Sequence, residues 1–198
     1  TRPTISVSRI SSCAGNALRS LGTESVGATV TITELHNASD CGGTTLHGAS
    51  NGTLSIANSR NWRGGAFLNS CQRTTGLSVT LRNVSQLSGN ALYYHGYYAE
   101  DASLSVTDCD DWSGNAGSFA FPESVGARIA VTDCHSLSGK ALYAPFVQAN
   151  GWSLDVTGAT NVSDWAFAYA GEKSRRGTVS ITDCSDWRGN VGFRLPHS

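Results

Sequence analysis

The sequence has no methionine, little charge and no long apolar run. Charged residues make up 15% of its 198 residues and the net charge is −1, which gives no electrostatic basis for binding nucleic acid. No apolar run approaches the roughly 18 residues that a membrane-spanning helix needs, and no signal peptide or lipidation motif is visible. Because methionine is absent, Thr1 is not a translation start, so we expect a processed chain or a segment of a larger protein.

Motifs that hold metals or cofactors are also missing. The 5 histidines are scattered without the spacing of metal ligands. The sequence has no phosphate-binding glycine loop, no Cys-x-x-Cys pair and no catalytic arrangement of Ser, His and Asp. We therefore expect neither a metal nor a cofactor.

What the sequence does contain is a repeat of about 25 residues, seen most clearly as LSVTDCDDWSGNA at residues 104–116. A fixed period of this length is the mark of a solenoid and outranks other sequence signals. Successive copies are 25 or 24 residues apart, and their first aliphatic residues are Ile5, Val30, Leu54, Val79, Leu104, Ile129, Leu154 and Val179.

Each repeat begins with a pattern typical of a half-buried strand. The first and third positions are aliphatic, as in Leu104 and Val106, and Ser or Thr stands between and after them in most copies. This alternation has the period of a β-strand, and no segment has the 3.6-residue spacing of a helix. The Asn and the Leu ladder of leucine-rich repeats are missing as well.

These features predict an all-β fold, a right-handed parallel β-helix of eight coils of about 25 residues. We expect residues 1–198 to form a single β-helix domain. Neither end has an amphipathic helix to cover the exposed backbone of the last coil. The domain is therefore expected to be a segment that continues into a longer solenoid or stacks end to end on another copy.

Two kinds of turn residue recur within the coil. Asp or Asn follows the first strand, where it favours the start of a turn, and Gly supplies a bend with positive φ a few residues later. The positions are Asn58, Asn83, Asp108, Asp133 and Asp183 for the first kind, and Gly15, Gly89, Gly114 and Gly189 for the second.

The repeat register separates the cysteines into two groups. Cys109, Cys134 and Cys184 share a slot that Ile10, Leu35, Val84 and Ala159 fill in other copies, so they are predicted to be buried thiols. Cys134 and Cys184 are two coils apart, roughly 9–10 Å, which exceeds disulfide reach. Cys13 and Cys41 lie near the same register in adjacent coils and are the predicted disulfide. The register does not place Cys71.

Four N-glycosylation sequons, at Asn37, Asn51, Asn83 and Asn161, favour an extracellular or cell-surface location.

An acidic group at the fifth and sixth repeats comprises Asp108, Asp110, Asp111 and Asp133. Stacked carboxylates on a β-helix can hold calcium or act as an acid–base pair in polysaccharide cleavage. Many parallel β-helices resemble pectate lyases and polygalacturonases in architecture, but this sequence lacks their Gly-His-Gly and Arg-x-Lys motifs. The alternative, which we favour, is that Asp at a strand end caps a turn.

Two further surface features are candidate binding sites. The segment 93–98 contains four tyrosines, more than one coil can bury, so Tyr94, Tyr97 and Tyr98 are predicted to form an exposed patch for a sugar or a protein. The outward Ser and Thr residues of the first strands resemble the ladders of ice-binding solenoids, although Ala57, Arg82, Ala130 and Asp155 interrupt them. High β-propensity on a solvated face also explains these residues.

The repeat unit SVTDCxDWSGNA, with its GNALY variants, resembles the repeats of the trypanosomatid dispersed gene family surface proteins. The resemblance covers all eight copies. It implies a segment of a large, membrane-anchored ectodomain with a long β-helix that acts in adhesion, and it assigns no catalytic residue.

The sequence as a whole predicts a non-enzymatic, extracellular structural or adhesive solenoid. Its expected partners are a second copy or neighbouring coils, glycans and cell-surface proteins, with no nucleic acid and no membrane span in this chain. A carbohydrate-active β-helix enzyme and an ice-binding solenoid are the two alternatives.

Overall fold

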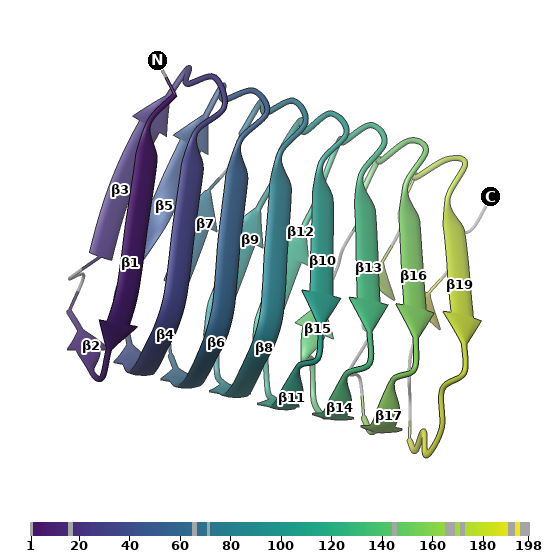
Figure 1. The fold of residues 1–198 in the computed structure, drawn as a ribbon. Helices are drawn as coiled ribbons and strands as arrows, with labels where there is room; N and C mark the ends of the chain where they lie inside the picture. Colours follow the sequence, from purple (N-terminus) through teal and green to yellow (C-terminus); the bar gives the residue numbers. More distant parts are fainter. Residues whose placement is uncertain are drawn as a thin grey trace.

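In the computed structural model the chain is a solenoid of stacked parallel strands (Figure 1). The structure describes residues 2–15, 18–64, 67–70, 72–143, 146–164, 169–170, 173–189 and 193–194. Within these ranges the backbone alone is described at 18–23, 42–47, 67–70, 92–95, 118–119, 143, 169–170 and 193–194. No helix occurs in any of these ranges, so the predicted all-β class is confirmed.

One long parallel sheet forms the face that is nearest the viewer in Figure 1. Its main strands lie side by side in chain order: β1 (Thr4–Ile10), β4 (Thr29–Ser39), β6 (Thr53–Arg63), β8 (Ser78–Ser88), β10 (Ser103–Thr107), β13 (Arg128–Thr132), β16 (Ser153–Thr157) and β19 (Thr178–Thr182). Four short strands extend this sheet around a bend: β2 (Cys13–Ala14), β11 (Asp110–Ser113), β14 (His135–Leu137) and β17 (Thr160–Val162).

A second parallel sheet of six strands forms the opposite face. Its strands are β3 (Leu18–Thr23), β5 (Gly42–His47), β7 (Phe67–Ser70), β9 (Leu92–His95), β12 (Gly117–Ala120) and β15 (Leu142–Tyr143). The strands β18 (Tyr169–Ala170) and β20 (Phe193–Arg194) pair separately. The chain runs down the front sheet and up the back sheet while it advances from the N-terminus to the C-terminus, so the coil is right-handed (Figure 1).

The strands pair in the register that the 25-residue period predicts. Ile5 lies opposite Val30, Leu104 opposite Ile129, and Leu154 opposite Val179. Every predicted first aliphatic residue pairs with the next one along the first sheet. The repeat therefore fixes both the fold and the stacking of equivalent residues.

The core is a set of stacked apolar columns enclosed by the coil. Leu104 and Val106 are 2% and 0% exposed, whereas the residues between and beside them face outward. A further position of the repeat, which holds a large apolar side chain, is also buried. Trp62 and Trp112 occupy it in the third and fifth coils and are completely covered. Each indole N–H donates to a carbonyl of the preceding coil, Leu35 for Trp62 and Val84 for Trp112, both at 2.9 Å. The burial of Trp62 and Trp112 thus leaves neither indole N–H unsatisfied.

The corners of the coil are made by residues in the left-handed region. In the fifth coil these are Asp108, Asp111, Gly114, Glu123 and Gly126, with φ between 54° and 70°. The same five positions have positive φ in the sixth coil. The predicted turns at Asp108 and Gly114 are confirmed, and three further left-handed corners occur, at Asp111, Glu123 and Gly126.

Gly139 and Gly151 provide a matched test of this corner geometry, because both have positive φ, 65° and 68°. A Cβ at Gly139 would lie 2.9 Å from the backbone N of Gly114, whereas a Cβ at Gly151 would meet nothing nearer than 4.0 Å. Gly151→Ala is expected to lower the free energy of unfolding by about 1–2 kcal/mol, the cost of the left-handed region for an L-residue. Gly139→Ala is expected to lower the free energy of unfolding by a larger amount, because the neighbouring coil must move to make room for the Cβ. Urea unfolding measures both, and equal losses would contradict the close stacking of these corners.

Candidate functional site

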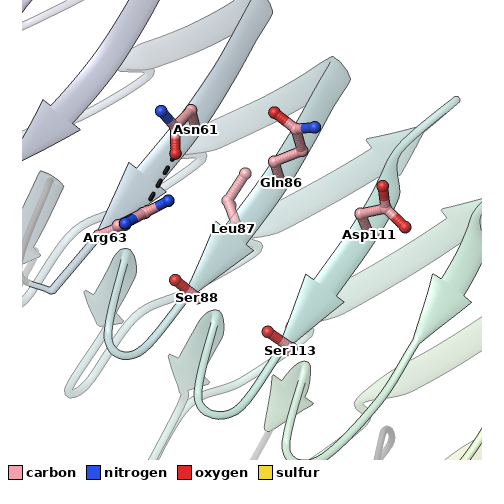
Figure 2. A pocket seen from close by; sticks show the side chains of 7 residues that line it. All are labelled: Asn61, Arg63, Gln86, Leu87, Ser88, Asp111 and Ser113. Atoms are coloured by element: carbon pink, nitrogen blue, oxygen red, sulfur yellow. Dashed lines mark hydrogen bonds between the residues drawn. The ribbon is translucent and has the colours of Figure 1, made fainter.

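An open groove runs along the outer surface, parallel to the axis of the solenoid. It consists of two adjoining hollows of about 500 and 370 Å³, which share Asp111 and Ser113. We call it the axial groove and define it by Asn61, Arg63, Gln86, Leu87, Ser88, Asp111, Trp112, Ser113, Ser136, Ser138, Asn161 and Ser163. Figure 2 shows its first hollow, with side chains from successive strands of the first sheet.

The groove lies over a column of buried side chains that stack in register from coil to coil. Trp62, Leu87 and Trp112 stack on one another in the core. Because side chains alternate between faces, the residues immediately before and after each of them point outward. The residue before this buried position has positive φ in each of the five coils that line the groove, from 52° at Asn161 to 59° at Asn61. Four steps of about 4.8 Å give the groove a length of roughly 19 Å.

Hydrogen bonds between side chains hold the two ends of the groove. The Arg63 Nε donates to Asn61 Oδ1 at 3.2 Å (Figure 2), and the Asn61 amide donates to Asn37 Oδ1 in the preceding coil. At the other end, Asn161 Nδ2 donates to Ser136 Oγ at 3.3 Å. These end residues are therefore already engaged.

The middle of the groove is different, because two of its polar side chains, Gln86 and Asp111, are exposed and unengaged. Within the described part of the chain, neither the Gln86 amide nor the Asp111 carboxylate has a hydrogen-bond or ion-pair partner. Arg63 and Asp111 are the two charged residues in the lining, and the others are amides, hydroxyls or the edges of buried apolar side chains. The groove therefore suits a neutral ligand that is rich in hydrogen-bonding groups.

The four predicted acidic residues are placed in three different columns. Asp108 and Asp133 stack at the first corner, with φ of 54° and 50°. Asp110 lies opposite His135 and its Oδ1 accepts the backbone N–H of Asp111 at 2.8 Å. Asp111 is the one carboxylate of the four that lines the described groove.

Each of these carboxylates has a local environment that fits a turn better than catalysis. Asp108 forms an ion pair with Arg82 at 3.6 Å, and left-handed residues are enriched in Asp and Asn because their short polar side chains satisfy the local backbone. Hydrolysis of a glycosidic bond ordinarily uses two carboxylates facing one substrate. The groove brings a single one, Asp111, to its described lining.

The predicted tyrosine patch lies at another corner of the coil. Tyr98 is 50% exposed and has φ of 55°, whereas Tyr97 is half-buried. The side chain of Tyr94, on β9, lies outside the described residues. Of the three predicted residues, Tyr98 is thus the one that the structure places clearly at the surface.

All four sequon asparagines are exposed corner residues with positive φ, from 51° to 52°. The Asn37 side chain donates to the backbone oxygen of Ser11 at 2.9 Å, and that of Asn83 donates to Asn58 Oδ1 at 2.9 Å. Asn161 lies in the axial groove. Their modification remains a prediction.

The outward hydroxyl rows run along the first sheet, where equivalent side chains stack from coil to coil. Thr157 and Thr182 hydrogen-bond to each other through their hydroxyls at 3.0 Å. Ala57 and Arg82 pair in register and interrupt one row, and Ala130 and Asp155 interrupt another. Ice binding by this face remains an alternative that the structure does not test.

Cys13 and Cys41, the pair favoured by the register, form a disulfide with a Cα–Cα distance of 5.4 Å. The bridge is diagonal, because Cys13 lies opposite Ala38 rather than Cys41. Cys109 and Cys134 are buried free thiols and Cys184 is a half-buried one. Cys71 lies outside the described residues.

Two kinds of feature are absent from the described residues. These residues contain no group of three or more His, Cys, Asp or Glu side chains arranged to hold a metal ion. They also contain no helix with the length and hydrophobicity to cross a membrane.

No protein-family model and no curated protein matches the sequence. The β-solenoid fold is therefore established by the structure itself, and the resemblance to the dispersed gene family rests on the repeat motif alone.

Substitutions at Asp133 test whether the aspartates stacked at the first corner, Asp108 and Asp133, are needed for the turn conformation or for their charge. Its φ is 50°, a conformation that Asn tolerates and a β-branched residue does not. Asp133→Asn is expected to change the free energy of unfolding by less than about 0.5 kcal/mol, whereas Asp133→Val is expected to lose at least about 1–2 kcal/mol. Urea unfolding of both variants decides this. A large loss in Asp133→Asn would mean that the charge itself is needed.

Proposed function

We propose that this chain is a non-enzymatic, extracellular segment of a structural and adhesive β-solenoid. The observation that carries the proposal is the axial groove, which presents the unengaged Gln86 amide and Asp111 carboxylate, with Ser88 and Ser113 beside them, on neighbouring coils. A stiff support with a repeated row of hydrogen-bonding groups suits contact with an extended ligand better than it suits the enclosure of a small one.

The chemistry of the groove favours a neutral glycan as the adhesive partner. Its two charged residues have opposite signs, and its other polar groups both donate and accept hydrogen bonds. A glycan offers hydroxyl groups along its length, so several weak contacts add up across neighbouring coils. The resemblance to adhesive trypanosomatid surface proteins agrees with this role, and membership of that family is part of the proposal.

The outermost strands support the proposed continuation of the rod. β1 and β19 are the two edges of the first sheet in the described chain, and Ile5 and Ile181 are each 40% exposed there. An edge strand offers unpaired backbone groups to another strand. We therefore propose that further coils or a second copy of the chain pair with these edges.

An extracellular location is supported by two features. Structural disulfides persist in oxidising compartments, and Cys13 and Cys41 form one. The four sequon asparagines are exposed, which is compatible with glycosylation of the folded surface.

The adhesive role is tested by binding of the purified chain to a panel of immobilised neutral and acidic polysaccharides. The double variant Gln86→Ala/Asp111→Ala is expected to bind a neutral polysaccharide at least about tenfold more weakly, since each lost hydrogen bond contributes about 1 kcal/mol. Tyr98→Ala, at a different corner, is the matched control and should bind as the unmodified chain does. Loss of binding in Tyr98→Ala alone would move the site to the tyrosine patch.

The enzymatic alternative is favoured by one observation, the exposed Asp111 in a groove. Viscosity and reducing-end assays on polysaccharides, with and without calcium, are expected to show no depolymerisation by the unmodified chain, because a second lining carboxylate is not seen in the described groove. Calcium-dependent cleavage that is lost in Asp111→Ala would replace the adhesive proposal. For the ice-binding alternative, the deciding measurement is thermal hysteresis.

A further inference from the structure

Two of the buried thiols lie one coil apart in the same slot. Cys109 and Cys134 are both 0% exposed. The backbone pairs on both sides of them, with Thr107 opposite Thr132 and Asp110 opposite His135. The two cysteines are therefore stacked directly, at the strand spacing of about 4.8 Å, which is within the Cα–Cα range of disulfides.

Backbone hydrogen bonds on both sides fix this spacing. The Asp108 N–H donates to the Thr132 carbonyl at 3.1 Å, and the His135 N–H donates to the Cys109 carbonyl at 2.9 Å. Each sulfur lies near the carbonyl two residues before it, at 3.3 Å for Cys109 and 3.4 Å for Cys134. The side chains of both cysteines thus turn into the same part of the core.

We propose that Cys109 and Cys134 form a second disulfide between coils, which clamps the fifth coil to the sixth at the middle of the axial groove. The coils that it joins carry Asp111 and Ser113 on one side and Ser136 and Ser138 on the other. Cys13–Cys41 shows that this chain already bridges neighbouring coils at a comparable spacing.

The bond forms by exchange with an external disulfide such as oxidised glutathione. One protein thiol loses its proton, attacks a glutathione sulfur and releases one glutathione thiolate. The second protein thiol then displaces the other glutathione. The protein loses two hydrogen atoms, and one external disulfide is reduced to two thiols.

The two thiols influence each other in the buried slot. A hydrogen bond between them lowers the pKa of Cys134, and the same bond together with burial raises the pKa of Cys109. The thiol that loses its proton first supplies the thiolate, which is the attacking species. Because both sulfurs are buried, exchange takes place while the chain folds or when the two coils open.

Peptide mapping tests the proposal directly. A Cys71→Ser variant of the full chain is refolded from urea with oxidised and reduced glutathione, alkylated and digested with trypsin without reduction. Cleavage after Arg82, Arg128 and Lys140 separates the two cysteines, so the expected product is peptide 83–128 linked to peptide 129–140. Cys184 is the internal control, since Ala159 lies between it and Cys134 in the column, and it should be recovered as an alkylated thiol.

Stability gives a second measurement. The oxidised chain should unfold at a higher urea concentration than the reduced chain, and this difference should shrink in Cys109→Val, which keeps only the Cys13–Cys41 bridge. Val is the residue of the same slot one coil earlier, Val84, so the variant is expected to fold. Recovery of Cys109 and Cys134 as alkylated thiols beside an intact Cys13–Cys41 bridge would overturn the proposal, and so would an equal yield of links to Cys184.

Discussion

The structure depends on hydrogen bonding between the backbones of neighbouring coils. The N–H groups of a strand point alternately to the two neighbouring coils, and Ser153 of β16, for example, donates to the Ala127 carbonyl of the preceding coil at 2.9 Å. At the left-handed corner of the sixth coil, the Asp133 N–H donates to the Thr157 carbonyl of the following coil at 2.9 Å. Left-handed residues thus bend the chain without breaking its links to both neighbours. This satisfaction of backbone groups is what a solenoid requires at every coil.

The same bonding turns each sequence position into a column. Each residue must therefore pack against the residues at the same position of the neighbouring coils as well as fit its own environment. Trp62 can fill the large slot because its indole N–H finds the Leu35 carbonyl one coil back. His135 hydrogen-bonds to Thr160 in the next coil at 2.6 Å. Contacts of this kind link neighbouring coils through their side chains, so the rod is cooperative along its length.

The period alone was sufficient to predict the fold and the pairing of residues, because a parallel stack allows a single register for a 25-residue repeat. The turns at Asp108 and Gly114 were also predictable, since Asp and Gly announce a left-handed corner. The corner at Glu123 was not, because its slot holds Tyr98, Gln148 and Lys173 in other coils and carries no compositional signal. The slot of Asp111 carries a mixed signal, since Asn61 and Asn161 favour a left-handed corner whereas Gln86 and Ser136 do not. The groove depends on this corner, so the sequence pointed to Asp111 without showing what surrounds it.

The residues that can contact a ligand therefore lie in the columns that face outward, because core packing does not restrict the residue type there. The inner columns of the described chain hold mainly aliphatic, aromatic, alanine and cysteine side chains, and the buried polar residues Ser59, Thr74 and Ser124 are the exceptions. The outer column that contains Gln86, Asp111 and Ser136 changes in residue type from coil to coil while its backbone conformation stays constant, with φ between 53° and 58°. A rigid scaffold that holds varied polar side chains at a fixed spacing can change its ligand by substitution at these corners and keep its fold.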